Sequence, residues 1–167
     1  LGMHLSCYGD SLARTPHLDQ LAQEGIQFTN AYVTQASCSP SRSSIFTGLY
    51  PHQNGQVGLA HRGFTMLEGI PNLVQTLKGD GYRTGIIGKL HVQPAQAFPF
   101  DYQQLKARPT RDVRQVAEQL KEFIQAGEDP FFVSLNYFDP HVQFFSQIEG
   151  IPENPFSSEE VSSFPFQ

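Results

Sequence analysis

The residues best suited to chemistry in this chain are Cys38 and Arg42, which stand four positions apart around a proline. Pro40 suits the first turn of an α-helix, and this places Cys38 at a helix N-terminus, where unpaired N–H groups and the helix dipole favour negative charge. Arg42 lies one turn further on and can swing back toward the same anion. Residues 38–42 therefore predict a reactive side chain beside an anion-binding group.

Three more candidates follow other apolar stretches. Lys89 and His91 come directly after residues 83–88, and His141 comes shortly after residues 131–138. An ammonium group neutralises an anion, and an imidazole can hold or donate a proton near neutral pH. These three residues are candidate partners of Cys38.

Each candidate also has an ordinary explanation when it is taken singly. A lone Cys38 is more often a small buried residue, and a lone Lys89 is most often a solvated surface charge. A single His141 is usually structural, and Arg42 could pair with a nearby carboxylate. Only their common placement favours a site.

The elements that would place them are four predicted helices and three predicted strands. The first helix starts at Thr15-Pro16, carries Leu18 and Leu21 on one face and ends at Gly25. The other helices cover residues 40–46, 71–78 and 111–125, and the strands cover residues 26–33, 83–88 and 131–138.

Near-continuous apolar strands that alternate with amphipathic helices imply a parallel sheet covered on both faces. The predicted fold class is therefore α/β, with a mostly parallel sheet flanked by helices. In such sheets ligands bind beyond the carboxyl ends of the strands. The three predicted strands lead to Cys38, to Lys89 with His91, and to His141, so we expect these side chains at one edge of the sheet.

Composition narrows the class of protein. The 167 residues are enough for one domain with a real core. The net charge of −5 argues against a nucleic-acid partner but leaves room for a small anionic substrate. Cys7 and Cys38 are too few for a disulfide scaffold, although one bridge between them stays open. No apolar stretch reaches the ~18 residues of a membrane span, and no signal-peptide pattern opens the chain.

Several motifs resemble those of the sulfatase family, the formylglycine-dependent hydrolases of the alkaline-phosphatase superfamily. Cys38-Ser39-Pro40-Ser41-Arg42 with Thr47-Gly48 matches the signature in which the cysteine is oxidised to formylglycine. Gly88-Lys89-Leu90-His91 and Asp139-Pro140-His141 are similar to two further elements of the family. Residues 50–55, 85–92 and 98–102 are most similar to its heparan N-sulfatase branch and to bacterial relatives.

The resemblance implies hydrolysis of sulfate esters or sulfamates, on a sulfated sugar such as those of heparan sulfate. Catalysis would fall to Cys38, Arg42, Lys89, His91 and His141. A formylglycine-generating enzyme would oxidise Cys38. Family members occur in lysosomal, periplasmic or secreted locations.

The resemblance also implies a Ca²⁺ ion, for which formylglycine at Cys38 is the one ligand expected in this chain. The family's Asp-Asp and Asp-Asn metal ligands have no match here, and Leu1-Gly2 resembles the residues just after the first pair. We therefore expect an N-terminal fragment, inactive alone. Residues 1–150 would be part of the catalytic domain, and 151–167 an irregular loop or the start of an insertion.

Two alternatives remain open. A phosphonate or phosphodiester hydrolase of the same superfamily can share the formylglycine signature. A non-catalytic interaction module could keep the fold without the metal half-site.

Overall fold

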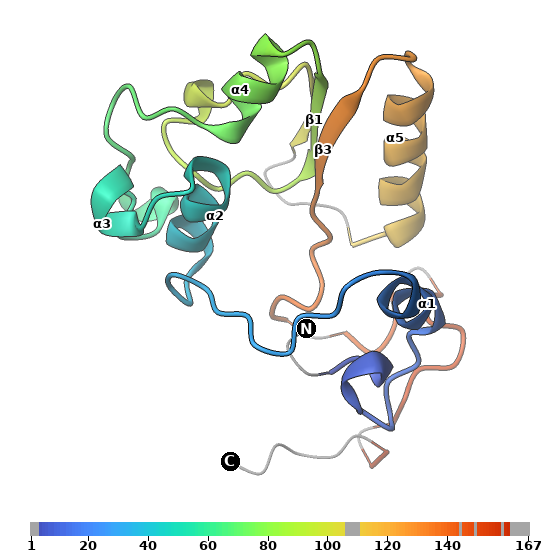
Figure 1. Cartoon of the computed structure of the whole chain (residues 1–167). Coiled ribbons are helices and arrows are strands. Elements are labelled where there is room, and N and C mark those ends of the chain that lie inside the picture. The colour runs from blue at the N-terminus through green and yellow to red at the C-terminus, as the bar shows by residue number, and fades with distance from the viewer. Residues whose placement is uncertain (1–3, 106–110, 144, 149, 158, 161–167) are drawn as a thin grey trace. The chain divides into compact units, whose positions relative to one another are not determined.

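The computed structural model of the protein describes residues 4–105, 111–143, 145–148, 150–157 and 159–160 (Figure 1). The chain divides into two compact units. One consists of Leu1–Tyr32 with Pro140–Gln167, and the other of Val33–Asp139. The sheet and the helices α2 to α5 belong to the second and larger unit.

The larger unit is built on a parallel sheet with strand order β2-β1-β3. The central strand β1 (Arg83–Gly88) is buried along its four inner residues, which explains its unbroken apolar character. On one side β3 (Phe131–Leu135) pairs with it, and on the other side β2 (Tyr102–Leu105) does. Both pairings are parallel, so the predicted α/β class with a parallel sheet is confirmed.

Helices cover both faces of this sheet. Figure 1 shows α4 (Leu73–Gly79) on one side of the strands and α5 (Val113–Gln125) on the other, and both helices contact β1. Side-chain caps set where they begin: Asn72 accepts the N–H of Gln75, and Asp112 accepts the N–H groups of Arg114 and Gln115. Both helices therefore start two residues later than predicted.

The remaining helical elements of this unit lie between residue 38 and residue 97. They are α2 (Cys38–Thr47), α3 (Pro51–Asn54) and the 3₁₀ turns η2 (Ala60–Arg62) and η3 (Ala95–Ala97). The helix predicted at residues 40–46 is confirmed, and it begins two residues earlier, at Cys38 itself.

A hydrophobic core fixes α2 against the sheet. Phe46 of α2 is buried with Val74 of α4 and Ile86 of β1. The Phe46 ring also packs on two aromatic rings that precede β2, with centroids 5.2 Å from Phe98 and 6.0 Å from Phe100. Each such buried side chain contributes about 1.5–3 kcal/mol. These contacts pack α2 firmly against the core that it shares with the sheet.

The smaller unit holds η1 (Ser6–Tyr8), α1 (Pro16–Glu24) and an isolated bridge between Ile148 and Ile151. The first predicted helix is confirmed as α1. Its expected apolar face is nevertheless exposed, since none of the residues of α1 is buried. Within the described residues, no helix has both the length and the apolar character needed to cross a bilayer.

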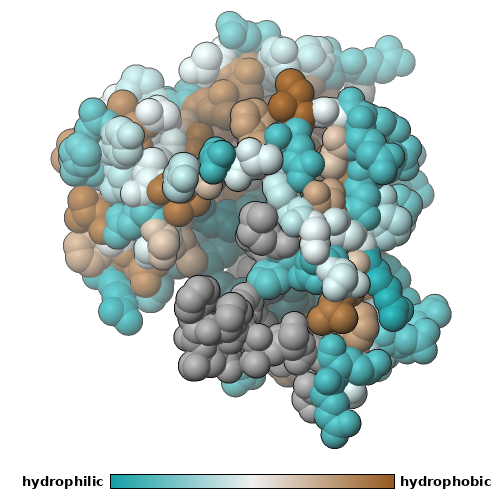
Figure 2. Space-filling view, turned by 60° about the horizontal axis from the view of Figure 1, so that its bottom comes forward, coloured by the Kyte–Doolittle hydropathy of each residue, from teal (hydrophilic) through white to brown (hydrophobic). Residues whose placement is uncertain are grey.

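The strand predicted at residues 26–33 is wrong, because this segment is not in a strand. Its apolar side chains are exposed, Ile26 by 85% and Tyr32 by 91%. Figure 2 shows hydrophobic residues at the surface in several places. β-branched and aromatic residues favour extended backbone, but a strand forms only where a neighbouring strand supplies hydrogen bonds.

Candidate active site

The signature cysteine opens α2. Cys38 is the first residue of this ten-residue helix, and Ser37 before it has extended backbone. The thiol is free and half-buried. N–H groups in a first helical turn have no intrahelical acceptor, so the positive end of the helix dipole faces this side chain. Cys38 therefore lies where negative charge is favoured.

Arg42 joins α2 to the sheet. Its Nη1 donates to the Lys89 carbonyl oxygen at 2.8 Å and to Asn136 Oδ1 at 2.6 Å. Because Lys89 follows β1 and Asn136 follows β3, one guanidinium group ties two neighbouring strand ends to the helix. Burial lowers the pKa of Arg42 from its ordinary value, and the electrostatic interaction with Cys38 acts in the opposite direction. A guanidinium stays charged in proteins, so this group is a fixed cation.

Asn136 is a site residue that the sequence analysis missed. The strand predicted at residues 131–138 ends instead at Leu135, and Asn136 is the first residue beyond it. Its backbone N–H still donates to the Ile87 carbonyl at 2.9 Å, which extends the β1–β3 ladder by one bond. A polar amide directly after an aromatic strand was the signal that could have found it.

Lys89 and His91 lie after β1, as predicted. Lys89 is half-buried, and its carbonyl oxygen is the acceptor for Arg42. His91 has a φ of 52°, which is uncommon for a residue with a side chain. Its Nε2 lies 2.9 Å from Nδ1 of His61, a residue of η2 that the sequence analysis also missed.

A buried polar network holds α2 against the segment that follows it. Asn54 of α3 is fully buried and donates through Nδ2 to Ser43 Oγ at 3.1 Å and to Thr47 Oγ1 at 3.2 Å. Ser39 Oγ accepts the N–H of Ala60 at 3.0 Å. The small hydroxyl residues of α2 are therefore the partners of buried polar groups, and they fix the helix that carries the cysteine and the arginine.

Taken together, the larger unit places a helix N-terminus, a free thiol and a half-buried cation beside the ends of parallel strands. The Sulfatase family model matches residues 2–160 of the chain. The chain belongs to the sulfatase family. It is 38% identical over 148 residues to N-sulphoglucosamine sulphohydrolase of Homo sapiens, a match that covers 84% of the chain and 30% of that protein.

Two solved structures share the fold of this sulfatase-family chain. BT4656 in complex with its substrate D-glucosamine-2-N,6-O-disulfate superposes with a TM-score of 0.73 at 24% identity, over 86% of this chain and 33% of that one. The phosphonate monoester hydrolase of Agrobacterium radiobacter superposes with a TM-score of 0.65 at 22% identity, over 84% of this chain and 39% of that one. The chain has their alkaline-phosphatase-like fold and spans about a third of the length of these matches.

Four of the five predicted catalytic residues of this sulfatase-family chain lie in the larger unit: Cys38, Arg42, Lys89 and His91. The fifth, His141, lies in the other unit, where it is exposed and its Nδ1 donates to the Val142 carbonyl at 2.8 Å. The part of His141 in the site therefore stays a prediction.

The described part of the chain does not fit a metal ion by itself. Within it, no three side chains of the His, Cys, Asp or Glu types gather closely enough to hold one. Ca²⁺ takes six to eight oxygen ligands. The Ca²⁺ ion implied by the resemblance has no ligand set among the described residues.

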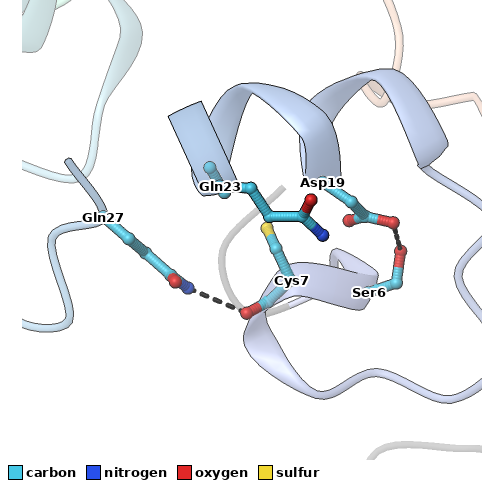
Figure 3. Close-up of a pocket in the computed structure, with 6 residues that line it drawn as sticks. Ser6, Cys7, Asp19, Gln23 and Gln27 are labelled. Atoms are coloured by element: carbon cyan, nitrogen blue, oxygen red, sulfur yellow. Dashed lines mark hydrogen bonds between the residues drawn. The ribbon is translucent and has the colours of Figure 1, made fainter. Parts of the chain in front are cut away.

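A second cysteine lies in a separate pocket of the smaller unit. Figure 3 shows the Cys7 sulfur beside Gln23, in a cavity of about 370 Å³. The groups around it bond one another: Ser6 Oγ donates to Asp19 Oδ2 at 2.6 Å, and Gln27 Nε2 donates to the Cys7 carbonyl at 2.8 Å. The first bond joins η1 to α1, and the second joins η1 to the segment after α1. None of the predicted catalytic residues lines the pocket.

Proposed function

We propose that the full-length protein hydrolyses sulfate esters or sulfamates of a sulfated sugar, through a formylglycine made from Cys38. The observation that carries the proposal is the Arg42 contact with the Lys89 carbonyl, because it joins the signature helix to the Gly-Lys-x-His segment. The match to the Sulfatase family model supports the reaction class. The likeness to N-sulphoglucosamine sulphohydrolase supports a sugar substrate, and within it a sulfamate.

Cys38 is suited to the modification. It is free, half-buried and placed at the first residue of a helix. An aldehyde hydrate at this position supplies one hydroxyl that takes up the sulfuryl group and a second hydroxyl whose proton loss releases sulfate. An unmodified thiol has no second hydroxyl, which is why the oxidation matters.

The other residues of the chain would manage charge and protons. The guanidinium group of Arg42 would lie near position 38 and would bind the sulfuryl oxygens of the substrate there. Lys89 and His91 would neutralise those oxygens as charge moves onto the leaving group. His141 would act as the general acid: it would donate a proton to the sugar oxygen or nitrogen when the bond from that atom to sulfur breaks. Residues 1–150 would form the N-terminal part of the catalytic domain, and 151–167 a loop or the start of an insertion.

Mass spectrometry of the full-length protein, produced with a formylglycine-generating enzyme, tests the proposal directly. The tryptic peptide with Cys38 should be about 18 Da lighter in the aldehyde form than with cysteine, because oxygen replaces sulfur and two hydrogens are lost. The peptide with Cys7 should keep its thiol and serves as the internal control. Unmodified Cys38 throughout would refute the formylglycine mechanism.

The substrate class is tested by offering the modified protein three substrates of similar size: an O-sulfated glucosamine, an N-sulfated glucosamine and a phosphodiester. We expect the turnover of at least one sulfated glucosamine to exceed the turnover of the phosphodiester. A preference for the phosphodiester would instead support the phosphonate or phosphodiester hydrolase alternative. Absence of turnover with all three, in modified protein, would favour the non-catalytic module.

A further inference from the structure

Both acceptors that hold Arg42 are electrically neutral. One is the backbone carbonyl of Lys89 and the other is the side-chain amide of Asn136. Within the described residues, no carboxylate forms an ion pair with Arg42. By contrast, Arg111 in the same unit is paired with the Asp139 carboxylate. Arg42 is thus fixed in place while its positive charge stays uncompensated.

The amide of Asn136 can face Arg42 in only one orientation. Its Nδ2 donates to the Ile87 carbonyl at 3.2 Å, to the Ser134 carbonyl at 3.0 Å and to Ser134 Oγ at 3.1 Å. A flipped amide would turn its oxygen toward two carbonyl oxygens, which can only accept hydrogen bonds. The three hydrogen bonds that Nδ2 donates therefore keep Asn136 Oδ1 turned toward the guanidinium of Arg42.

We propose that Asn136 is a positioning residue for the sulfuryl group: it fixes Arg42 through a neutral acceptor, so that the full charge of the guanidinium meets an anionic substrate. An aspartate in its place would hold the same guanidinium more strongly but would neutralise it and repel a sulfate oxygen. This inference rests on the proposed sulfatase function. It goes beyond that function in assigning a role to the first residue after β3.

Two variants of the full-length protein distinguish this role from a merely structural one. In Asn136→Asp the new carboxylate pairs with Arg42, and we expect the affinity for inorganic sulfate to fall at least tenfold. In Asn136→Ala the guanidinium is loosened but stays charged, so we expect a smaller loss of sulfate affinity together with a lower kcat. Both variants lose the hydrogen bonds that Nδ2 donates, so a structural role alone would lower the free energy of unfolding of both and leave the sulfate affinity of the folded protein unchanged.

The matched control is Asn72→Asp, which makes the same chemical change at a buried asparagine elsewhere in the same unit. Asn72 caps α4, and among the described residues its side chain bonds Gln75 and Ala97 and not Arg42. Aspartate caps a helix equally well. We expect its sulfate affinity to stay within twofold of the wild type. An equal loss in Asn72→Asp and Asn136→Asp would reduce the effect to net charge and overturn the inference.

Sulfate affinity is measured by calorimetry, which needs no turnover, and kcat and KM are measured with a sulfated sugar. Wild-type protein that binds sulfate but does not hydrolyse the substrate would contradict the proposed function and leave the Asn136 comparison intact. If neither Asn136 variant folds, a crystal structure of the wild type with sulfate decides. Arg42 should then contact both the anion and Asn136 Oδ1, and an Arg42 turned away from Asn136 would overturn the inference.

Discussion

His61 Nδ1 lies 2.9 Å from His91 Nε2, and the two rings are nearly parallel, with 12° between their planes and 5.1 Å between their centroids. The centroid distance exceeds the nitrogen distance by about the width of one ring, so the rings meet edge to edge. An N–H···N bond needs one protonated and one bare nitrogen. Whichever ring donates, the bond ties the tautomer of His91 to the protonation of His61.

Replacing His61 with alanine should lower kcat/KM of the full-length protein about fivefold near neutral pH, because one hydrogen bond worth about 1 kcal/mol is lost. The measurement is kcat/KM of both proteins near neutral pH with the same sulfated sugar.

His52→Ala is the control, since His52 is an exposed imidazole of α3 that stacks on Tyr50. We expect its kcat/KM to stay close to that of the wild type, and an equal loss in His52→Ala would show that the effect of His61→Ala is not specific to the histidine pair. No defect at all would show that His91 is held by other contacts.

Local signals in the sequence predicted much of the fold. Caps, glycines and short apolar runs can each be recognised within one segment of sequence. They predicted the helix beginning at Pro16, the strand Arg83–Gly88 and the signature helix that carries Cys38. The strand expected at residues 26–33 failed because a strand also needs a pairing partner, and composition does not supply one. The edge strand β2 was missed because the exposed Gln103 interrupts the apolar pattern that would indicate a strand.

The candidate site could be predicted only in part. Cys38, Arg42, Lys89 and His91 were proposed because they stand in motifs and were expected to follow predicted strands, and their catalytic roles stay predictions. Asn136 and His61 were missed because their contacts join positions that are 94 and 30 residues apart from their partners. Such contacts follow from how α2, β1 and β3 pack, and no local pattern encodes them.

Gly88→Ala should damage both stability and the site. Gly88 has a φ of 97°, and a Cβ there would lie 2.1 Å from the carbonyl oxygen of Asn136. A side chain on left-handed backbone lowers the free energy of unfolding by about 1–2 kcal/mol, and the clash of the new Cβ with backbone atoms lowers it by about 1–3 kcal/mol more. We expect a loss of about 3 kcal/mol in the free energy of unfolding, measured by urea denaturation, together with a loss of sulfate binding.

Gly81→Ala separates the two causes. Gly81 has a similar φ of 84°, but a Cβ there would meet no atom within 4 Å. This variant should lose only the cost of the backbone conformation, about 1–2 kcal/mol, and should bind sulfate normally. Equal losses in both variants would mean that the close approach of Gly88 and Asn136 contributes nothing.

The Asp101 carboxylate fastens the start of β2 to β1. Its Oδ2 accepts the N–H and the hydroxyl of Thr84, each at 2.9 Å, and its Oδ1 bonds the ammonium of Lys78. The hydrogen bond from Lys78 is the main cause that lowers the pKa of Asp101 from its ordinary value of 3.8. Thr84 is fully buried, so its N–H depends on this acceptor.

Asp101→Ala should therefore destabilise the full-length protein by about 1 kcal/mol near neutral pH, mainly because the buried Thr84 N–H loses its partner. A carboxylate whose pKa is lowered by folding stabilises the fold above its ordinary pKa and loses that effect as the pH falls through the lower, folded value. The difference between wild type and variant should thus be full at pH values above 3.8 and should shrink below it. Urea denaturation across this range measures it, and Asp80→Ala, an exposed carboxylate at the end of α4, should show no comparable loss near neutral pH. A difference that stays constant down to the acid limit would mean that the Asp101 charge does not fasten β2 to β1.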